Sequence, residues 1–178
     1  MADCILCNIV KGSAPASVVY TDEKVTAIMD IQPVNPGHVL VIPNMHAAYL
    51  SELDQETGGH LFKIAIRIAA AVRQSGVRCE GVNLLLADGQ AAGQSVFHVH
   101  LHVVPRFVGD GFGLKFGPNY GRRPNREELD ETAKKSEKRC VDRLRPKTAV
   151  RDKVNSKWNA LLFGKKRSRN VFQNFVSV

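Results

Sequence analysis

Short apolar runs bounded by turn residues dominate the first part of the chain. Their length and their many β-branched residues are typical of strands. We expect five strands, at residues 18–20, 25–29, 38–42, 82–86 and 97–104. Residues 21–24, which join the first two runs, indicate a hairpin, and Pro43 and Pro105 are expected to end the third and fifth strands.

Two segments show the periodicity of helices instead. Between about residues 55 and 73, apolar residues recur at helical spacing and predict a core-facing stripe of Leu61, Ala65, Ile68 and Val72. A second helix is predicted from Asn125 to about Leu144, because Asn125 and Glu128 have the spacing of a capping box. Five short strands with two main helices predict an α+β fold built on a five-stranded antiparallel sheet.

The charge divides the chain at about residue 145. The net charge of +8 lies entirely in residues 145–178, which hold nine Lys and Arg against the single acid Asp152, so that residues 1–144 are formally neutral. Pro146 interrupts the helical pattern at the same place. We therefore expect one domain over residues 1–144, with its core at about 4–108, followed by a basic tail. A solvated, flexible tail is favoured over one that contacts nucleic acid.

Composition excludes several classes of protein. With 44% hydrophobic and 24% charged residues, the 178-residue chain has the composition of a globular protein, which argues against wholesale disorder. It contains no apolar run long enough to span a membrane, and residues 1–4 do not start a secretory signal pattern. We therefore expect a cytoplasmic protein whose four cysteines are thiols or metal ligands.

The strongest chemical signal is a run of alternating histidines. His98, His100 and His102 alternate with apolar residues, so on a strand the three imidazoles would share one face, with neighbours roughly 6.5–7 Å apart. Three such rings destabilise a sheet face unless each has a partner. The loop just upstream contains Gly89, Gly93, Gln94 and Ser95, whose N–H groups and hydroxyl could surround a phosphate.

Residues 98–104, HVHLHVV, resemble the motif His-φ-His-φ-His-φ-φ (φ apolar) of the histidine triad (HIT) family of nucleotide hydrolases and transferases, in particular its Hint-like bacterial branch. The similarity extends from Cys4 to the end of the second predicted helix. The resemblance implies a homodimer in which two five-stranded sheets join into a ten-stranded one. It also implies attack by the middle histidine on an α-phosphate, giving a nucleotidyl-histidine that water hydrolyses.

The resemblance also implies a role for each site residue. His100 would be the nucleophile, with a backbone carbonyl holding its other nitrogen, and His102 would bind the phosphoryl oxygens or protonate the leaving group. Ser95, with Gly93 and Gln94, would stabilise charge on the phosphate. Asp30 would bind the ribose hydroxyls, and Ile31 would contact the sugar or base. His38 would lie behind the triad and contact it.

One position departs from the family pattern. Eleven residues before the first triad histidine, where the family commonly has a nucleotide-contacting asparagine, this chain has Ala87, followed by Asp88. Loss of one hydrogen bond costs ~1 kcal/mol, and a nearby carboxylate would repel phosphate. We therefore expect the substitution to affect turnover rate and substrate choice rather than the nucleophile.

A second site is indicated at the N-terminus. Cys4 and Cys7 form a CxxC, which alone is half of a zinc site or a pair of thiols packed against the core. The resemblance implies that His46 and His98 complete a structural Cys₂His₂ zinc site, and it implies no organic cofactor. His60, Cys79 and Cys140 are expected to have no role in either site.

Three functions remain open on the sequence. The first is an enzyme cleaving adenosine-like nucleotides, such as phosphoramidates or dinucleoside polyphosphates. The second is a non-catalytic nucleotide-binding or scaffolding protein whose basic tail contacts nucleic acid. The third is a metallohydrolase in which His98, His100 and His102 bind a catalytic zinc, although the CxxC and His46 offer a better-matched metal site.

Overall fold

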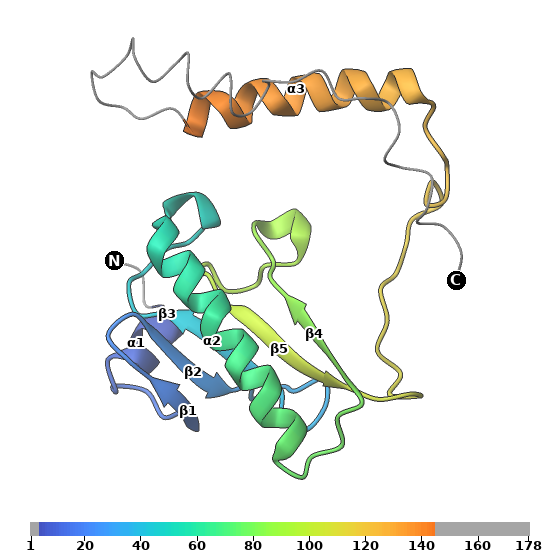
Figure 1. Cartoon of the computed structure of the whole chain (residues 1–178). Coiled ribbons are helices and arrows are strands. Elements are labelled where there is room, and N and C mark those ends of the chain that lie inside the picture. The colour runs from blue at the N-terminus through green and yellow to red at the C-terminus, as the bar shows by residue number, and fades with distance from the viewer. Residues whose placement is uncertain (1–3, 145–178) are drawn as a thin grey trace, which may run out of the picture. The chain divides into compact units, whose positions relative to one another are not determined.

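The computed structural model of the chain describes residues 4–144, and the chain divides between Lys115 and Phe116 into two compact units (Figure 1). The predicted domain boundary after residue 144 coincides with the end of the described residues and stays a prediction. The basic tail, with its predicted flexibility and nucleic-acid contact, lies outside them.

The first unit contains the predicted antiparallel sheet. Within the described residues its strands are β1 (Val18–Thr21), β2 (Val25–Met29), β3 (Val39–Pro43), β4 (Gly81–Leu85) and β5 (Leu101–Arg106). They pair in the order β1-β2-β3-β5-β4, every pair antiparallel. Together with the helices, this confirms the predicted α+β fold.

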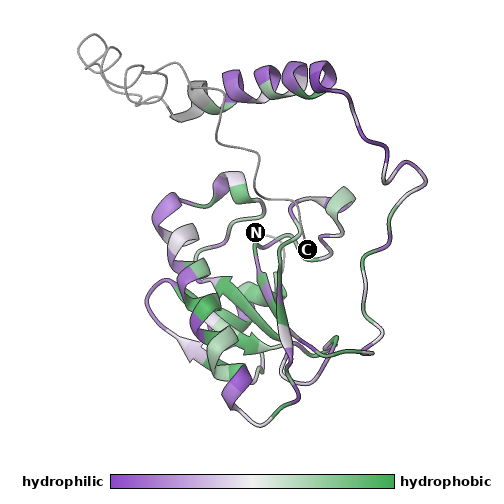
Figure 2. Cartoon of the chain, turned by 45° about the vertical axis from the view of Figure 1, so that its right-hand side comes forward, coloured by the Kyte–Doolittle hydropathy of each residue, from purple (hydrophilic) through white to green (hydrophobic). Residues whose placement is uncertain are grey.

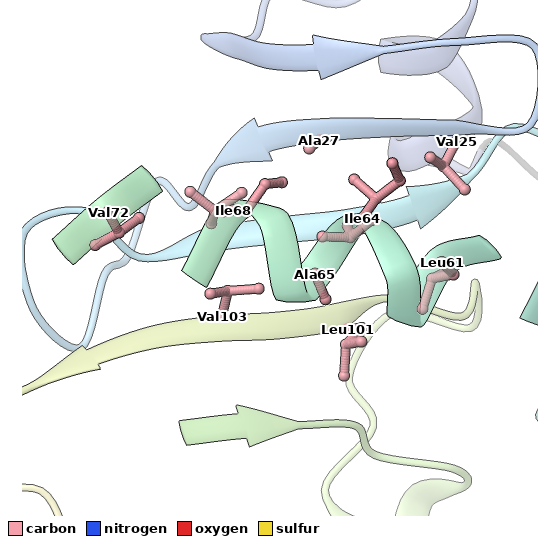
Figure 3. Close-up of a cluster of buried hydrophobic side chains, with 11 residues drawn as sticks. Val25, Ala27, Leu61, Ile64, Ala65, Ile68, Val72, Leu101 and Val103 are labelled. Atoms are coloured by element: carbon pink, nitrogen blue, oxygen red, sulfur yellow. The ribbon is translucent and has the colours of Figure 1, made fainter. Parts of the chain in front are cut away.

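One face of the sheet is covered by α2 (Gln55–Gln74), as Figure 3 shows. The helix begins at Asp54, whose carboxylate accepts the N–H of Thr57 at 2.8 Å. All four residues of the predicted apolar stripe are buried, and Ile64 joins them against side chains of β2, β3 and β5: Val25, Ala27, Val39, Val41, Leu101 and Val103. This cluster is the main hydrophobic core.

A short helix, α1 (Ile5–Val10), belongs to a second apolar cluster in which its Leu6 is buried with Ile28 of β2 and Ile42 of β3. Because alternate side chains of a strand point to opposite faces, burial on both sides explains why β2 and β3 are almost continuously buried. The sequence prediction missed α1, since six residues are too few to show helical periodicity.

The predicted bounds of the fifth strand were wrong at both ends. β5 begins at Leu101 rather than at residue 97, because the backbone before it leaves the ladder, with the N–H of Val99 donating to Ala47 at 2.7 Å. It runs through Pro105 to Arg106. His98 and His100 therefore lie in an irregular segment, and of the three histidines only His102 is on the strand.

A partly buried ionic network fixes the chain at the C-terminal end of β5. Asp110 accepts two hydrogen bonds from the guanidinium of Arg106, at 2.6 and 2.8 Å, and one from Asn35 at 2.8 Å. These bonds, first that with Arg106, lower the pKa of Asp110 well below its usual range. Asn35 also donates to the carbonyl of Pro105, at 2.8 Å. The network thus ties the turn between β2 and β3 to the end of β5.

The second unit contains α3 (Arg126–Leu144), which the sequence predicted together with its cap. Asn125 accepts the N–H of Glu128 at 2.9 Å, and Glu128 accepts the N–H of Asn125 at 3.0 Å, so the capping box is confirmed. Every described side chain from residue 126 to residue 140 is exposed, and Figure 2 shows a mostly hydrophilic helix. None of the helices within residues 4–144 is long and apolar enough to cross a membrane.

Candidate functional site

The hydrogen bond that His100 makes defines the protonation of its ring. Its Nδ1 atom lies 2.6 Å from the carbonyl oxygen of His98, and the ring is buried. A carbonyl oxygen can only accept, so Nδ1 of His100 carries the proton. In the neutral ring the Nε2 atom therefore has a free electron pair, as a nucleophile requires.

His102 is held in the opposite tautomer by a chain of hydrogen bonds. The N–H of Val34 donates to Nδ1 of His38 at 3.2 Å, so Nε2 of His38 carries the proton and donates to Nδ1 of His102 at 3.0 Å. The remaining proton of a neutral His102 is then on Nε2. The rings of His100 and His102 are 4.9 Å apart, centroid to centroid, so an electron pair and an N–H donor lie side by side.

Burial keeps His102 and His38 neutral. Burial lowers the pKa of His102 to about 4, helped by the neighbouring rings of His100 and His38 and opposed by Asp30. Burial also lowers the pKa of His38, again against the effect of Asp30, whose carboxylate lies 3.4 Å from its Nδ1. Near neutral pH, His102 is therefore a hydrogen-bond donor rather than a cationic acid.

Asp30, His38 and His102 also place three potential ligand atoms within 4.8 Å of one another. The hydrogen bond from His38 already occupies Nδ1 of His102, however, and that from Val34 occupies Nδ1 of His38. This group is therefore a hydrogen-bonded relay that positions His102, and the predicted place of His38 behind the triad agrees with it.

The loop before the histidines is braced by Gln94. Its buried side chain accepts the N–H of Gly89 at 2.7 Å and donates to the carbonyls of Ala48 and Val96 at 2.8 and 3.2 Å. Because these bonds use both ends of the amide, the Gln94 side chain shapes the loop, whereas the sequence analysis expected it at the nucleotide. Gly93, with φ +88°, adopts a backbone conformation that L side chains rarely reach.

Of the other expected nucleotide contacts, Ser95 and Ile31 are exposed, whereas the side chain of Asp30 is only 14% exposed. Ser95 has no hydrogen bond within residues 4–144, and Ile31 is 95% exposed, so both are free to meet a ligand. Asp30 uses one carboxylate oxygen to accept the N–H of Gln32 at 2.8 Å. Asp88 accepts the N–H of Leu50 at 3.0 Å, so one of its oxygens fastens the loop.

The Cys/His cluster has the geometry of a tetrahedral metal site. Nδ1 of His98 lies 3.5 Å from Sγ of Cys4, 3.5 Å from Sγ of Cys7 and 3.3 Å from Nδ1 of His46, and Cys7 lies 3.3 Å from His46. Around a zinc ion with bonds of about 2.3 Å to sulfur and about 2.0 Å to nitrogen, a tetrahedron separates two nitrogens by about 3.3 Å and a nitrogen from a sulfur by about 3.5 Å. The four residues therefore fit the metal site that the sequence analysis expected.

The protonation of His98 agrees with this assignment. Its Nε2 atom lies 2.9 Å from the carbonyl oxygen of Pro43, so Nε2 carries the proton and Nδ1 presents its electron pair to the two sulfurs. α1 brings the sulfurs together, since Cys4 is its N-cap and Cys7 lies in its first turn. Partial burial, with the adjacent Cys4, raises the pKa of Cys7, and a bound cation would reverse that effect.

His60 has a partner that the sequence did not reveal. Its Nε2 lies 2.6 Å from the carboxylate of Asp22, which also accepts the hydroxyl of Tyr20 at 2.8 Å. Desolvation alone would raise the pKa of Asp22, but its hydrogen bonds, first that with His60 and then those with the backbone N–H groups of Val25 and Lys24, lower it below its usual range. A depression of about 590 Å³ lies here, and no predicted site residue lines it. His60 therefore joins α2 to the β1–β2 hairpin, apart from both sites.

Comparisons with known proteins agree with this geometry. A family model described as "HIT domain" matches residues 11–109. An uncharacterised HIT-like protein of Borreliella burgdorferi is 42% identical over 118 residues, which cover 66% of this chain and 85% of the relative. Protein hit of Bacillus subtilis is 44% identical over 112 residues, 62% of this chain and 77% of the relative. The adenylylsulfatase HINT3 of Arabidopsis thaliana is 35% identical over 105 residues, 58% of this chain and 52% of the relative.

Solved structures with the same fold include a HIT family member from Bacillus subtilis, with a TM-score of 0.71, 38% identity and coverage of 77% of this chain and 96% of the other. A zinc-bound histidine triad protein from Mycobacterium smegmatis has a TM-score of 0.60 and 40% identity, covering 79% and 96%. A histidine triad nucleotide-binding protein from Candida albicans has a TM-score of 0.69 and 25% identity, covering 79% and 99%.

Proposed function

Because this chain belongs to the HIT family, we propose that it is a nucleotide hydrolase or nucleotidyl transferase that acts at the α-phosphate of adenosine-like nucleotides, such as phosphoramidates or dinucleoside polyphosphates. The observation that carries the proposal is the pair of opposite tautomers, an electron pair on His100 beside an N–H on His102. The adenylylsulfatase and the nucleotide-binding protein among its relatives support the same class of substrate.

In the first step, the electron pair of Nε2 of His100 attacks the α-phosphorus, and the bond from phosphorus to the leaving group breaks. The leaving group departs with the electron pair of that bond and takes a proton from water. The ring of His100 becomes a cation, which the carbonyl of His98 stabilises through the proton on Nδ1. In the second step, water attacks phosphorus, the bond to Nε2 breaks, and the proton lost by water goes to solvent.

His102 serves this reaction as a neutral donor. With its pKa lowered to about 4, its ring carries little positive charge near pH 7, and its Nε2–H can bind a phosphoryl oxygen whose charge increases in the transition state. The hydroxyl of exposed Ser95 would bind another oxygen, whereas the N–H groups of Gly93 and Gln94 already donate to the carbonyls of Gln90 and Gly89 and hold the loop in shape. Asp30 would accept from the ribose hydroxyls, and exposed Ile31 would contact the sugar or base.

We further propose that Cys4, Cys7, His46 and His98 hold a structural zinc ion. The zinc-bound relative supports this, as do the ligand separations. When bound, zinc would tie α1 to the segments that carry His46 and His98 and would add to the stability of the fold. A catalytic zinc held by all three triad histidines is disfavoured, because Nδ1 of His98 faces the cysteines.

A homodimer belongs to the same proposal. β4 is at the end of the described sheet, and an edge strand offers N–H and C=O groups to a second copy. Phe62 and Ile66, one turn apart on α2, are 51% and 54% exposed and would extend an apolar contact. We also expect the protein in the cytoplasm, where its free cysteines would stay reduced.

Substitution of the nucleophile tests the proposed activity. The variant His100→Ala should lose turnover of adenosine 5′-phosphoramidate by roughly four orders of magnitude or more, as removal of a catalytic nucleophile does elsewhere. Its circular dichroism and zinc content should stay unchanged, because neither the core nor the metal ligands are altered.

The matched control is His60→Ala, which removes a histidine outside both sites and should retain activity. In the unaltered protein, rapid quenching followed by mass spectrometry should locate an adenylyl adduct on His100. Undiminished turnover by His100→Ala, or no turnover by the unaltered protein on any of these nucleotides, would refute the proposal.

A further inference from the structure

His98 belongs to two networks at once. Its imidazole faces Cys4, Cys7 and His46, while its own backbone carbonyl accepts the proton of Nδ1 of His100 at 2.6 Å. The ring itself is completely buried. A change in the Cys/His cluster that displaces the backbone of His98 therefore also displaces the acceptor that defines the tautomer of His100.

The two cysteines are placed to react with each other. Both sulfurs lie 3.5 Å from the same atom, Nδ1 of His98, and all four donor atoms of the cluster lie within 4.8 Å of one another. Cys4 and Cys7 are separated by one helical turn, a spacing at which CxxC pairs form disulfides. Neither is fully buried, and the neighbouring His46 is exposed, so a small oxidant can reach the sulfurs.

We propose that Cys4 and Cys7 are an oxidation site, at which a hydroperoxide converts the pair to a disulfide, releases the bound metal and lowers the reactivity of His100. The effect on reactivity rests on the function proposed above, whereas oxidation and metal release do not depend on it. Nothing in the comparisons assigns such a modification.

The chemistry balances with hydrogen peroxide as the oxidant. One thiolate attacks a peroxide oxygen, the O–O bond breaks, and a sulfenic acid and hydroxide form. The second thiolate attacks the sulfenic sulfur, an S–S bond forms, and a second hydroxide leaves. The two sulfurs together lose two electrons, the peroxide is reduced to two waters once the hydroxides are protonated, and the metal keeps its oxidation state.

Disulfide formation removes both anionic ligands, and His46 and His98 alone do not form a closed four-ligand site. His98 then keeps the hydrogen bond of its ring to Pro43, but the contacts that hold its other ring nitrogen are lost. Loss of a group that orients a residue of a metal site typically costs about 10- to 100-fold in metal affinity or activity. We expect a decrease of that size in the rate of His100 adduct formation.

The experiment treats the full-length, zinc-loaded protein with increasing hydrogen peroxide. The background is a double variant, Cys79→Ser with Cys140→Ser, so that Cys4 and Cys7 are the only thiols. Three quantities are measured: zinc released to a colorimetric chelator, the mass of the peptide containing Cys4 and Cys7, and the rate of adduct formation at His100. We expect one zinc per chain, the loss of two hydrogens and the decrease in rate to occur together.

Recovery of the adduct rate after reduction distinguishes reversible disulfide formation from irreversible oxidative damage. Thiol reductant with added zinc should restore the rate, and reductant with a zinc chelator should not. ¹⁵N NMR of the imidazoles should show His100 with its proton on Nδ1 in the zinc-loaded protein and a mixture of tautomers after oxidation. This spectrum does not require turnover.

Each outcome decides one part of the proposal. Zinc release without any change in adduct rate or in the His100 spectrum would overturn the coupling. Sulfinic acids in place of a disulfide, or retained zinc, would overturn the oxidation site. Absence of turnover in the reduced, zinc-loaded protein would count against the proposed function alone, because the peptide mass, the zinc and the NMR spectrum still test this inference.

Discussion

Replacing His38 tests whether the tautomer of His102 matters for catalysis. The substitution His38→Leu removes the donor that lies 3.0 Å from Nδ1 of His102 and the acceptor of the Val34 N–H at 3.2 Å. The site is buried, with 3% of His38 exposed, so water cannot readily replace either partner. His38→Gln is the matched variant, because an amide can both accept from Val34 and donate to His102.

The expected decreases in kcat and in stability follow from the hydrogen bonds that His38→Leu removes. A buried polar group left without its partner costs ~1–3 kcal/mol. If the cost falls on His102 in the transition state, kcat decreases roughly 5- to 150-fold in His38→Leu. The N–H of Val34, left without its acceptor in the folded state, should lower the free energy of unfolding by a similar amount. In His38→Gln both losses should be much smaller.

The assay combines steady-state kinetics on adenosine 5′-phosphoramidate with ¹⁵N NMR of the His102 ring. We expect His38→Leu to lower kcat and to shift His102 from a pure Nε2–H tautomer to a mixture, with His38→Gln close to the unaltered protein. Urea unfolding measures the stability of both variants. The reasoning is refuted if folded His38→Leu keeps its kcat, or if both variants lose activity equally while only one changes tautomer.

Two further predictions concern stability and assembly. His38 and His102 are neutral in the folded protein, with lowered pKa values, the latter about 4, whereas the unfolded chain takes up protons near the ordinary histidine pKa of about 6.5. The free energy of unfolding should therefore decrease as the pH falls from about 6.5 to about 4; urea titrations that give equal stability at both ends of this window would contradict the argument. Phe62→Lys should convert the proposed dimer to a monomer in light-scattering measurements of molar mass, because it places a charge on the apolar face of α2. If the unaltered protein has the molar mass of a monomer, the proposed dimer is refuted.

The fold was largely predictable from local patterns. The stripe of Leu61, Ala65, Ile68 and Val72 placed α2, and the apolar runs placed the strands, because each of these elements buries at least one face. The predictions of secondary structure failed where tertiary contacts, and not the local sequence pattern, determine the backbone. α1 is too short to show a period, and the first part of the predicted fifth strand is held by Ala47 instead of a neighbouring strand.

The candidate site was also predictable only in part. The sequence by itself determined which chemical groups are available, since the alternation of the three histidines, the CxxC and His46 can all be identified without a structure. The family resemblance implied a backbone carbonyl for His100 and a place behind the triad for His38, but which atoms form the hydrogen bonds could not be read from the sequence. The donor to His102 comes from His38, 64 residues earlier, and the acceptor for His98 is the carbonyl of Pro43, 55 residues earlier.

Only the tertiary structure therefore decided which nitrogen of each ring carries its proton. Side-chain identity does not encode the direction of a backbone carbonyl or of a distant N–H, and those directions follow from how the strands and the turns between them pack. His98, His100 and His102 are chemically the same residue, yet the folded chain directs one toward the metal ligands, leaves the second with a free electron pair and makes the third a donor.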